Sequence, residues 1–135
     1  MVAHGTIAFD TLTTSDQVNT GTEKSLDTSY IFNGVAKAWV NFDGSASGAA
    51  ARDSFNVASM TDNGTGTYTV TFSNAVSSTS YTASGLIALE NDAGSYNPLS
   101  VADRATASCR VDCENNSSSN SDPVAVDTQI FGDLA

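Results

Sequence analysis

Apolar and polar residues alternate along most of this chain with a period of two. Residues 67–72 place Tyr68, Val70 and Phe72 on one side of an extended segment and three threonines on the other. Similar alternation recurs in 6–13, 36–42, 54–60, 81–89, 101–113 and 124–130. No window carries a convincing helical period, and the alanine run at 47–53 contains a glycine and is interpreted as a loop. We therefore expect about seven to eight strands and no helix.

Turn-forming residues separate these segments. The Asp62–Gly66 stretch contains Asn-Gly, which tolerates positive φ, so 54–60 and 67–73 are predicted to form a β-hairpin. Short strands at close spacing favour an all-β fold, an antiparallel β-sandwich or a jelly-roll-like arrangement. The length of 135 residues suits a single domain. We expect residues 1–28 to form an N-terminal strand or arm and residues 29–135 to form the sandwich.

The charge of the chain is strongly acidic. Fifteen Asp and Glu residues face five Lys and Arg residues, which gives a net charge of −10. Nucleic acid and anionic membrane surfaces attract basic faces, so neither is expected as a partner. No apolar run is long enough to insert into a membrane, and the first residues lack the pattern of a signal peptide. We expect a protein made in the cytoplasm and not secreted by a signal of its own.

Catalytic chemistry finds little support in the sequence. The one histidine is His4, which precedes the main periodic segments and is expected to be exposed. Asp112, Glu114 and Asp122 could gather oxygens around calcium, but they lack the spacing of a calcium-binding loop. We expect a non-enzymatic protein with no cofactor and no metal.

The two cysteines fall on the same side of one predicted strand. Cys109 and Cys113 are four residues apart, which corresponds to about 13 Å of extended chain. A disulfide requires Cα atoms within about 7 Å, so the two should not pair with each other. We expect small buried thiols that remain reduced, with pairing between subunits as the alternative.

Two large aromatic residues lie out of phase with the apolar faces of their strands. Trp39 shares a side with Lys37 and Asn41, and Phe131 falls on the polar side of the segment 124–131. Each is either part of the core or an anchor at an interface with another subunit. Interface anchors on a chain with few charges predict a symmetric homo-oligomer, for which a trimer is the expected state.

A turn-rich segment forms a second candidate surface. It combines an aromatic ring with amide and carboxylate groups, a composition that can stack on a sugar ring and hydrogen-bond to it. A structural role of the tyrosine in packing is the alternative. The candidate binding residues of this loop are Asn91, Asp92, Tyr96 and Asn97.

Residues 36–85 resemble a module found in tail fibres and other virion proteins of tailed bacteriophages, many of them marine. The resemblance rests on Lys37–Phe42 (KAWVNF), Arg52–Val57 (RDSFNV), Asp62–Gly66 (DNGTG) and the aromatic and aliphatic positions Tyr68, Val70, Phe72 and Tyr81. Residues 124–133 are similar to the way such modules end. The chain departs from the family at 48–51, where it has Gly-Ala-Ala-Ala in place of β-branched residues before the Arg-Asp pair.

The resemblance implies a structural protein on the exterior of a virion, with no catalytic residues. A tail-fibre or tip-type host-adhesion module is the first expectation. Its partners would be other virion proteins and a glycan or outer-membrane protein of the host. The alternatives are a capsid decoration protein bound to the major capsid protein and, with less support, a carbohydrate-binding module. A small glycan depolymerase would need a cleft with buried paired acids, of which the sequence gives no sign.

Overall fold

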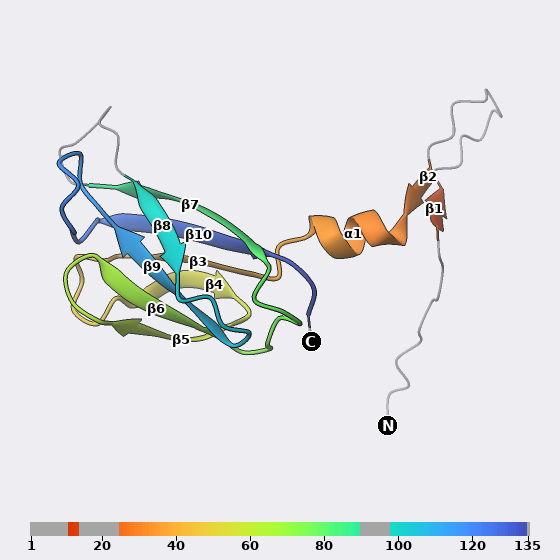
Figure 1. The fold of residues 1–135 in the computed structure, drawn as a ribbon, viewed down its shortest axis with the longest axis horizontal. Helices are drawn as coiled ribbons and strands as arrows, with labels where there is room; N and C mark the ends of the chain where they lie inside the picture. Colours follow the sequence, from red (N-terminus) through yellow and green to blue (C-terminus); the bar gives the residue numbers. More distant parts are fainter. Residues whose placement is uncertain (1–10, 14–24, 90–97, 135) are drawn as a thin grey trace. The chain divides into compact units, whose positions relative to one another are not determined.

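The computed structural model describes residues 11–13, 25–89 and 98–134 (Figure 1). The chain divides into two compact units, Met1–Val35 and Ala36–Ala135. The sequence suggested a boundary after Thr28, whereas the first unit extends through the helix that follows it. Each unit is described by itself below.

The first unit contains a small antiparallel sheet and one helix. β1 (Thr11–Thr13) pairs with β2 (Ser25–Asp27), and α1 (Thr28–Gly34) follows directly. The expectation of no helix was wrong here, because seven residues make only about two turns and cannot establish a periodic pattern. The helix buries no residue and exposes Tyr30 and Phe32. Within the described residues, no helix is long and apolar enough to cross a membrane.

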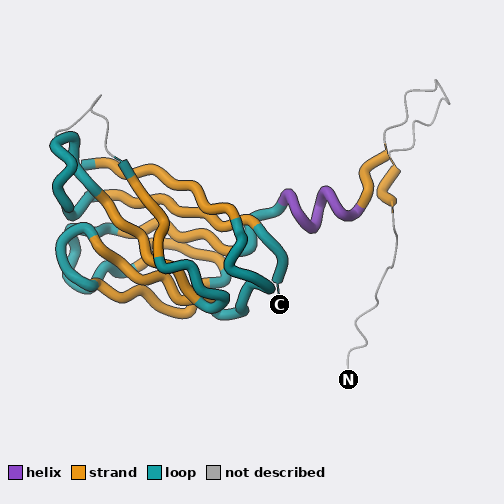
Figure 2. The backbone as a smooth tube through the Cα atoms, in the orientation of Figure 1, coloured by secondary structure: helices purple, strands orange, loops and turns teal. Residues whose placement is uncertain are grey.

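The second unit is an antiparallel β-sandwich, as the sequence predicted (Figure 2). In the part of the chain that the structure describes, eight strands form its two four-stranded sheets. The first sheet has the order β4 (Ala51–Phe55), β3 (Ala38–Phe42), β10 (Ala125–Phe131) and β7 (Thr82–Ala88). The second has the order β5 (Val57–Asp62), β6 (Thr67–Phe72), β9 (Ser108–Cys113) and β8 (Leu99–Ala102).

The core lies between the two sheets and follows the period-two pattern. In β3, β6, β9 and β10 alternate residues are buried, because each strand has one face toward the other sheet. Phe42 of β3 and Tyr68 of β6 meet edge to face, with ring centroids 4.9 Å apart, and so join the sheets. The Tyr68 hydroxyl donates to the Asp122 carboxylate at 2.8 Å, which also accepts the Gly66 N–H at 2.6 Å. Burial and this carboxylate raise the pKa of Tyr68 far above its usual value.

Two strands differ from the sequence-based expectation. The region 47–53 was interpreted as a loop, but β4 begins at Ala51 and pairs with β3. The long segment 101–113 divides into β8 and β9, which form a hairpin around a turn where Asp103 has positive φ. In both cases a polar or short strand at the edge of a sheet gives a weak hydrophobic pattern, so its pairing comes from its neighbour and not from local sequence.

The predicted hairpin around Asp62–Gly66 is confirmed, but its first strand starts later than expected. β5 and β6 pair antiparallel, whereas Phe55 belongs to β4 in the other sheet. The chain changes sheets at Asn56, which has φ of 56°. Asparagine adopts this left-handed conformation more readily than most residues, so it suits a sharp corner. Phe55 and Val57 are two positions apart and would share one side of an uninterrupted strand. Because of this corner, they lie in different sheets instead.

Candidate functional site

The outer face of the sheet β4-β3-β10-β7 carries the most unusual combination of side chains in the sandwich. Inward residues of these strands fill the core, so the residues between them point away from it. We call this surface the Trp39 face. Its members are Trp39, Asn41, Asp53, Phe55, Ser84, Leu86, Asp127 and Gln129.

Strand register arranges these side chains in two rows across the sheet. One row runs from β4 to β7 through four paired positions: Phe55, Trp39, Gln129 and Ser84. The next row runs in the same direction: Asp53, Asn41, Asp127 and Leu86. Directly opposed residues on one sheet face have Cβ atoms about 4.5–5.5 Å apart. Each row is therefore a set of side chains in mutual reach, contributed by segments far apart in the sequence.

Exposed apolar side chains gather on the Trp39 face. Trp39 is 37% exposed, Phe55 52% and Leu86 75%. In the described part of the sandwich, one other large hydrophobic residue is exposed, Leu134. Single exposed apolar residues are common, and three on one sheet face make this surface the candidate binding surface of the sandwich.

The polar groups of the face are held in fixed orientations by one another. The Asn41 side-chain amide donates to the Asp127 carboxylate at 2.7 Å, and the Gln129 amide donates to the Ser84 hydroxyl at 3.1 Å. Both bonds leave acceptors directed to solvent, because each carboxylate or carbonyl oxygen accepts more than one hydrogen bond. The face has no Lys or Arg among its members, since Lys37, which precedes β3, is buried. It is therefore acidic and rich in acceptors.

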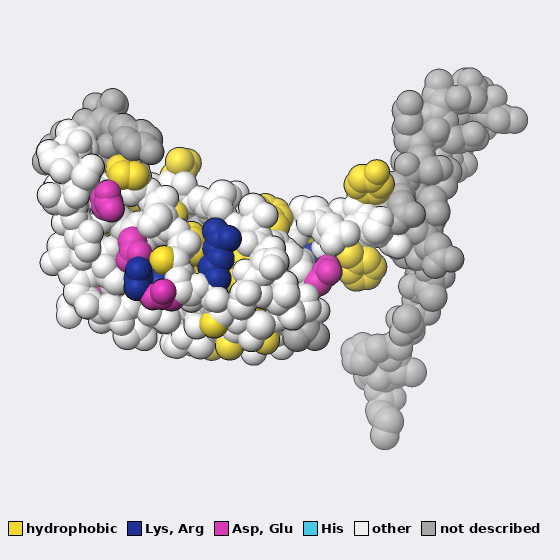
Figure 3. All heavy atoms as spheres, viewed as in Figure 1, with side chains coloured by type: hydrophobic (Ala, Val, Ile, Leu, Met, Phe, Trp, Pro, Cys, Tyr) yellow, Lys and Arg dark blue, Asp and Glu magenta, His cyan; other side chains and the backbone are white. Residues whose placement is uncertain are grey.

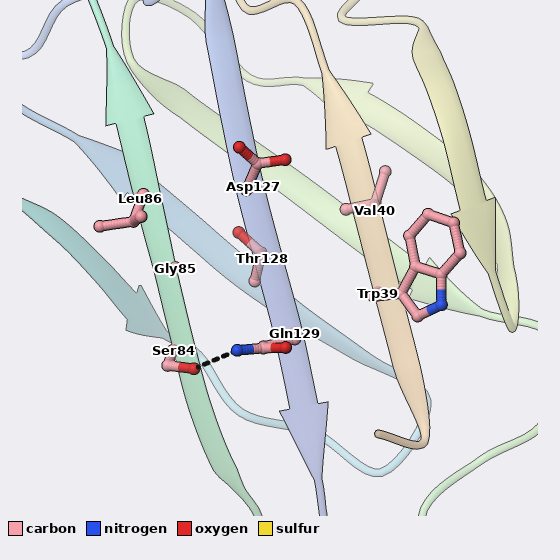
Figure 4. Close-up of a pocket in the computed structure, with 8 residues that line it drawn as sticks. All are labelled: Trp39, Val40, Ser84, Gly85, Leu86, Asp127, Thr128 and Gln129. Carbon is pink, nitrogen blue, oxygen red and sulfur yellow. Dashed lines mark hydrogen bonds between the residues drawn. The ribbon is translucent and has the colours of Figure 1, made fainter. Parts of the chain in front are cut away.

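A shallow hollow of about 430 Å³ crosses this face (Figure 4). Trp39 of β3 stands at one side and Leu86 of β7 at the other, and Gln129 and Asp127 of β10 lie between them (Figure 4). Gly85 occupies an inward position between Ser84 and Leu86, where a Cβ would meet Leu99 of the other sheet. The volume lies within the range of about 300–1,000 Å³ typical of small-ligand sites.

The outer face of the other sheet has a different character. Threonines of β6 alternate with its buried residues, and Arg110 of β9 is paired with Asp112 at 3.0 Å and with Asp103. Figure 3 shows basic and acidic side chains next to one another on one face of the sandwich. Those ion pairs raise the pKa of Arg110, mainly through Asp112. The charges there are ion-paired, whereas within the described residues no ion pair involves Asp53 or Asp127 of the Trp39 face.

The structure brings the two predicted interface residues to one surface. Phe131, at the end of β10, is half-buried and lies two positions beyond Gln129, so it is a diagonal neighbour of Trp39 on the same side of the sheet. The candidate loop residues Asn91, Asp92, Tyr96 and Asn97 lie outside the described residues.

Phe55 is the member of the face that sequence reasoning missed. Its alternation with Val57 suggested a core position in the hairpin strand. The signal that could have corrected this is Asn56 itself, because asparagine between two apolar residues is compatible with a left-handed corner. The alternation of inward and outward side chains before such a corner does not continue through it into the next strand.

The remaining candidate groups are engaged in structural roles. Cys109 and Cys113 form no disulfide and lie buried on the inner side of β9. Burial raises the pKa of Cys109 to about 11 and that of Cys113 to about 12. Among the described residues, no group of three or more His, Cys, Asp and Glu side chains is arranged to hold a metal ion. His4 lies outside those residues.

Comparison of the chain with protein-family models, with curated proteins and with solved structures gives no match.

Proposed function

We propose that this protein is a non-enzymatic structural component of the exterior of a bacteriophage particle, acting as a tail-fibre or tip-type adhesion module. The observation that carries the proposal is the Trp39 face, where exposed aromatic rings and fixed polar groups share one rigid sheet. The segments that resemble the phage module, 37–42 and 52–57, supply β3, β4 and the corner. They contribute four of the eight members of the face: Trp39, Asn41, Asp53 and Phe55.

The character of the face supports binding over catalysis. A carboxyl that acts as an acid at neutral pH needs burial or a close second carboxylate to raise its pKa. Asp127 and Asp53 are both exposed, and the Asp127 carboxylate accepts a hydrogen bond from the Asn41 side chain. Such a surface recognises a ligand by shape, stacking and hydrogen bonds.

The first unit supports attachment to other virion proteins. Its helix α1 buries no residue, and Tyr30, Phe32 and Val35 are all more than half exposed. Exposed aromatic residues are enriched at the centres of protein interfaces. We propose that this unit contacts other virion proteins and that the protein forms a homo-oligomer, for which a trimer is expected. Light scattering at micromolar concentration tests the oligomer, and a monomer of 13.9 kDa would contradict it.

Labelling of purified particles tests the proposed location. Antibodies raised against the sandwich should mark the tail tip or fibres in electron micrographs, and the isolated protein should compete with particles for adsorption to the host. Labelling over the whole head without effect on adsorption would favour the alternative, a capsid decoration protein. Particles that carry no label would refute both.

A further inference from the structure

We propose that the Trp39 face binds a neutral glycan chain, with sugar rings stacked along Trp39 and Phe55 and their hydroxyls bonded to the β10 side chains. The proposal rests on the proposed function in one respect: it takes this face to be accessible on the particle. It assigns the ligand to strand residues of the sandwich instead of the predicted loop residues 91–97.

The two aromatic residues provide a platform of suitable form. Trp39 and Phe55 occupy directly opposed positions on β3 and β4, and both are substantially exposed. The apolar faces of sugar rings pack on aromatic rings, and two neighbouring rings can carry consecutive units of a chain. Leu86 lines the side of the hollow opposite Trp39, so apolar side chains limit the hollow at both sides.

The polar floor supplies what a hydroxyl-rich ligand requires. Asp127 and Gln129 present oxygen acceptors, while the Ser84 hydroxyl can donate. Each sugar hydroxyl both donates and accepts, so this mixture can satisfy several at once. The bonds between Asn41 and Asp127 and between Gln129 and Ser84 hold these groups in place before a ligand arrives, which reduces the entropy lost on binding.

Charge selects a neutral ligand. Asp53 and Asp127 are members of the face and no cation is, while the whole chain has a net charge of −10. A sulfated or carboxylated polysaccharide would bring like charges together without a basic partner, which costs affinity. A neutral chain avoids this cost and still uses the carboxylates as acceptors.

The size of the face argues against a second copy of the chain as its occupant. The face is four strands wide, at about 4.8 Å per strand, and about five residues long, at about 3.3 Å per residue. Its area is therefore roughly 300 Å². A stable protein–protein interface buries about 800 Å² on each partner. Two such faces meeting would also bring four carboxylates together. Subunit contacts in an oligomer therefore have to include other surfaces.

Binding is tested with the full chain on an array of short unbranched oligosaccharides. Neutral hexose and N-acetylhexosamine chains are the probes, and sulfated and carboxylated chains on the same array are the contrast. Trp39 is the only tryptophan of the sequence, so its fluorescence emission reports occupancy of this face directly. We expect saturable binding of at least one neutral chain, with a change in emission, and no preference for the charged ones.

Substitutions locate the ligand. Trp39→Ala should weaken binding more than about tenfold, because it removes the larger of the two stacking rings, while Trp39→Phe should retain part of the affinity. Asp127→Ala should also weaken it. Leu134→Ala shortens an apolar side chain of the sandwich that is 49% exposed and is not a member of the Trp39 face, and it should leave binding unchanged. Thermal melts confirm that each variant is folded.

The possible outcomes separate the inference from the proposed function. Failure to bind any neutral chain, preference for charged chains, or equal binding by Trp39→Ala would overturn the glycan site. If the array stays empty while the protein still blocks adsorption, the adhesion function stands with a different receptor. If Trp39→Ala dissociates an oligomer and leaves glycan binding intact, the face is a subunit interface. Glycan binding by a protein absent from particles would refute the proposed function alone.

Discussion

Replacement of Asn56 by alanine should be among the most destabilising single changes in the sandwich. Asn56 is the corner between β4 and β5, with φ of 56°. Its side-chain amide donates to the backbone carbonyls of Lys37 and Asn74, at 2.9 and 3.0 Å. Its side-chain oxygen accepts from the Asn74 backbone N–H at 2.7 Å and from the Asn74 side chain at 3.1 Å. One residue thus joins the start of β3, the corner and the turn after β6.

The magnitude follows from two separate losses. The four side-chain hydrogen bonds are partly exposed, so about 0.5 kcal/mol each is appropriate, which sums to about 2 kcal/mol. Alanine in the left-handed region adds about 1–2 kcal/mol. The free energy of unfolding should therefore fall by about 3–4 kcal/mol. For a unit of about 100 residues this lowers the melting temperature by more than about 10 °C.

Urea denaturation followed by circular dichroism measures the loss in the free energy of unfolding. One further variant separates the hydrogen-bond loss from the backbone strain, and another serves as a control. Asn56→Gly loses the same hydrogen bonds but tolerates positive φ, so it should lose less stability than Asn56→Ala. Asn116→Ala changes an exposed asparagine and should stay within about 0.5 kcal/mol of the unaltered protein. A loss below about 1 kcal/mol for Asn56→Ala, or a glycine variant less stable than the alanine variant, would refute this reasoning about the corner.

Two other predictions concern the core. Thr128 is 5% exposed, and among the described residues its hydroxyl has no hydrogen-bond partner. The nearly isosteric Thr128→Val should therefore raise the free energy of unfolding by about 1 kcal/mol in the same urea titration. A destabilised variant would show that the hydroxyl is satisfied. Cys109 and Cys113 should not react with a thiol reagent at neutral pH in the folded protein and should give two titratable thiols after denaturation without reductant, because burial raises the pKa of both. Since the raised values favour the neutral thiols in the folded state, their contribution to stability is complete below about pH 9 and is lost as the pH rises toward about 11 and 12. Fewer than two thiols after denaturation would indicate cross-links between subunits.

Alternation of apolar and polar residues was enough to establish an all-β fold and the inward faces of most strands. Tyr68, Val70 and Phe72 had to share one side, because a strand turns its side chains by half a revolution at each residue. The hairpin around Asp62–Gly66 was also local, since its turn chemistry and both strands lie within a short stretch of the chain. For the same reason, the sequence correctly placed Trp39 on the side of its strand opposite the core residues.

Tertiary structure alone decided which strands became neighbours, and with them the composition of the Trp39 face. β10 lies between β3 and β7, so Gln129 and Asp127 meet residues more than forty positions away in the sequence. Period-two patterning indicates which side of a strand faces the core but carries no information about the strand beside it. Phe55 depended further on the φ value of Asn56, which moves the chain from one sheet to the other. Cross-sheet packing selects that corner, because it lets Phe55 leave the core while Val57 enters it.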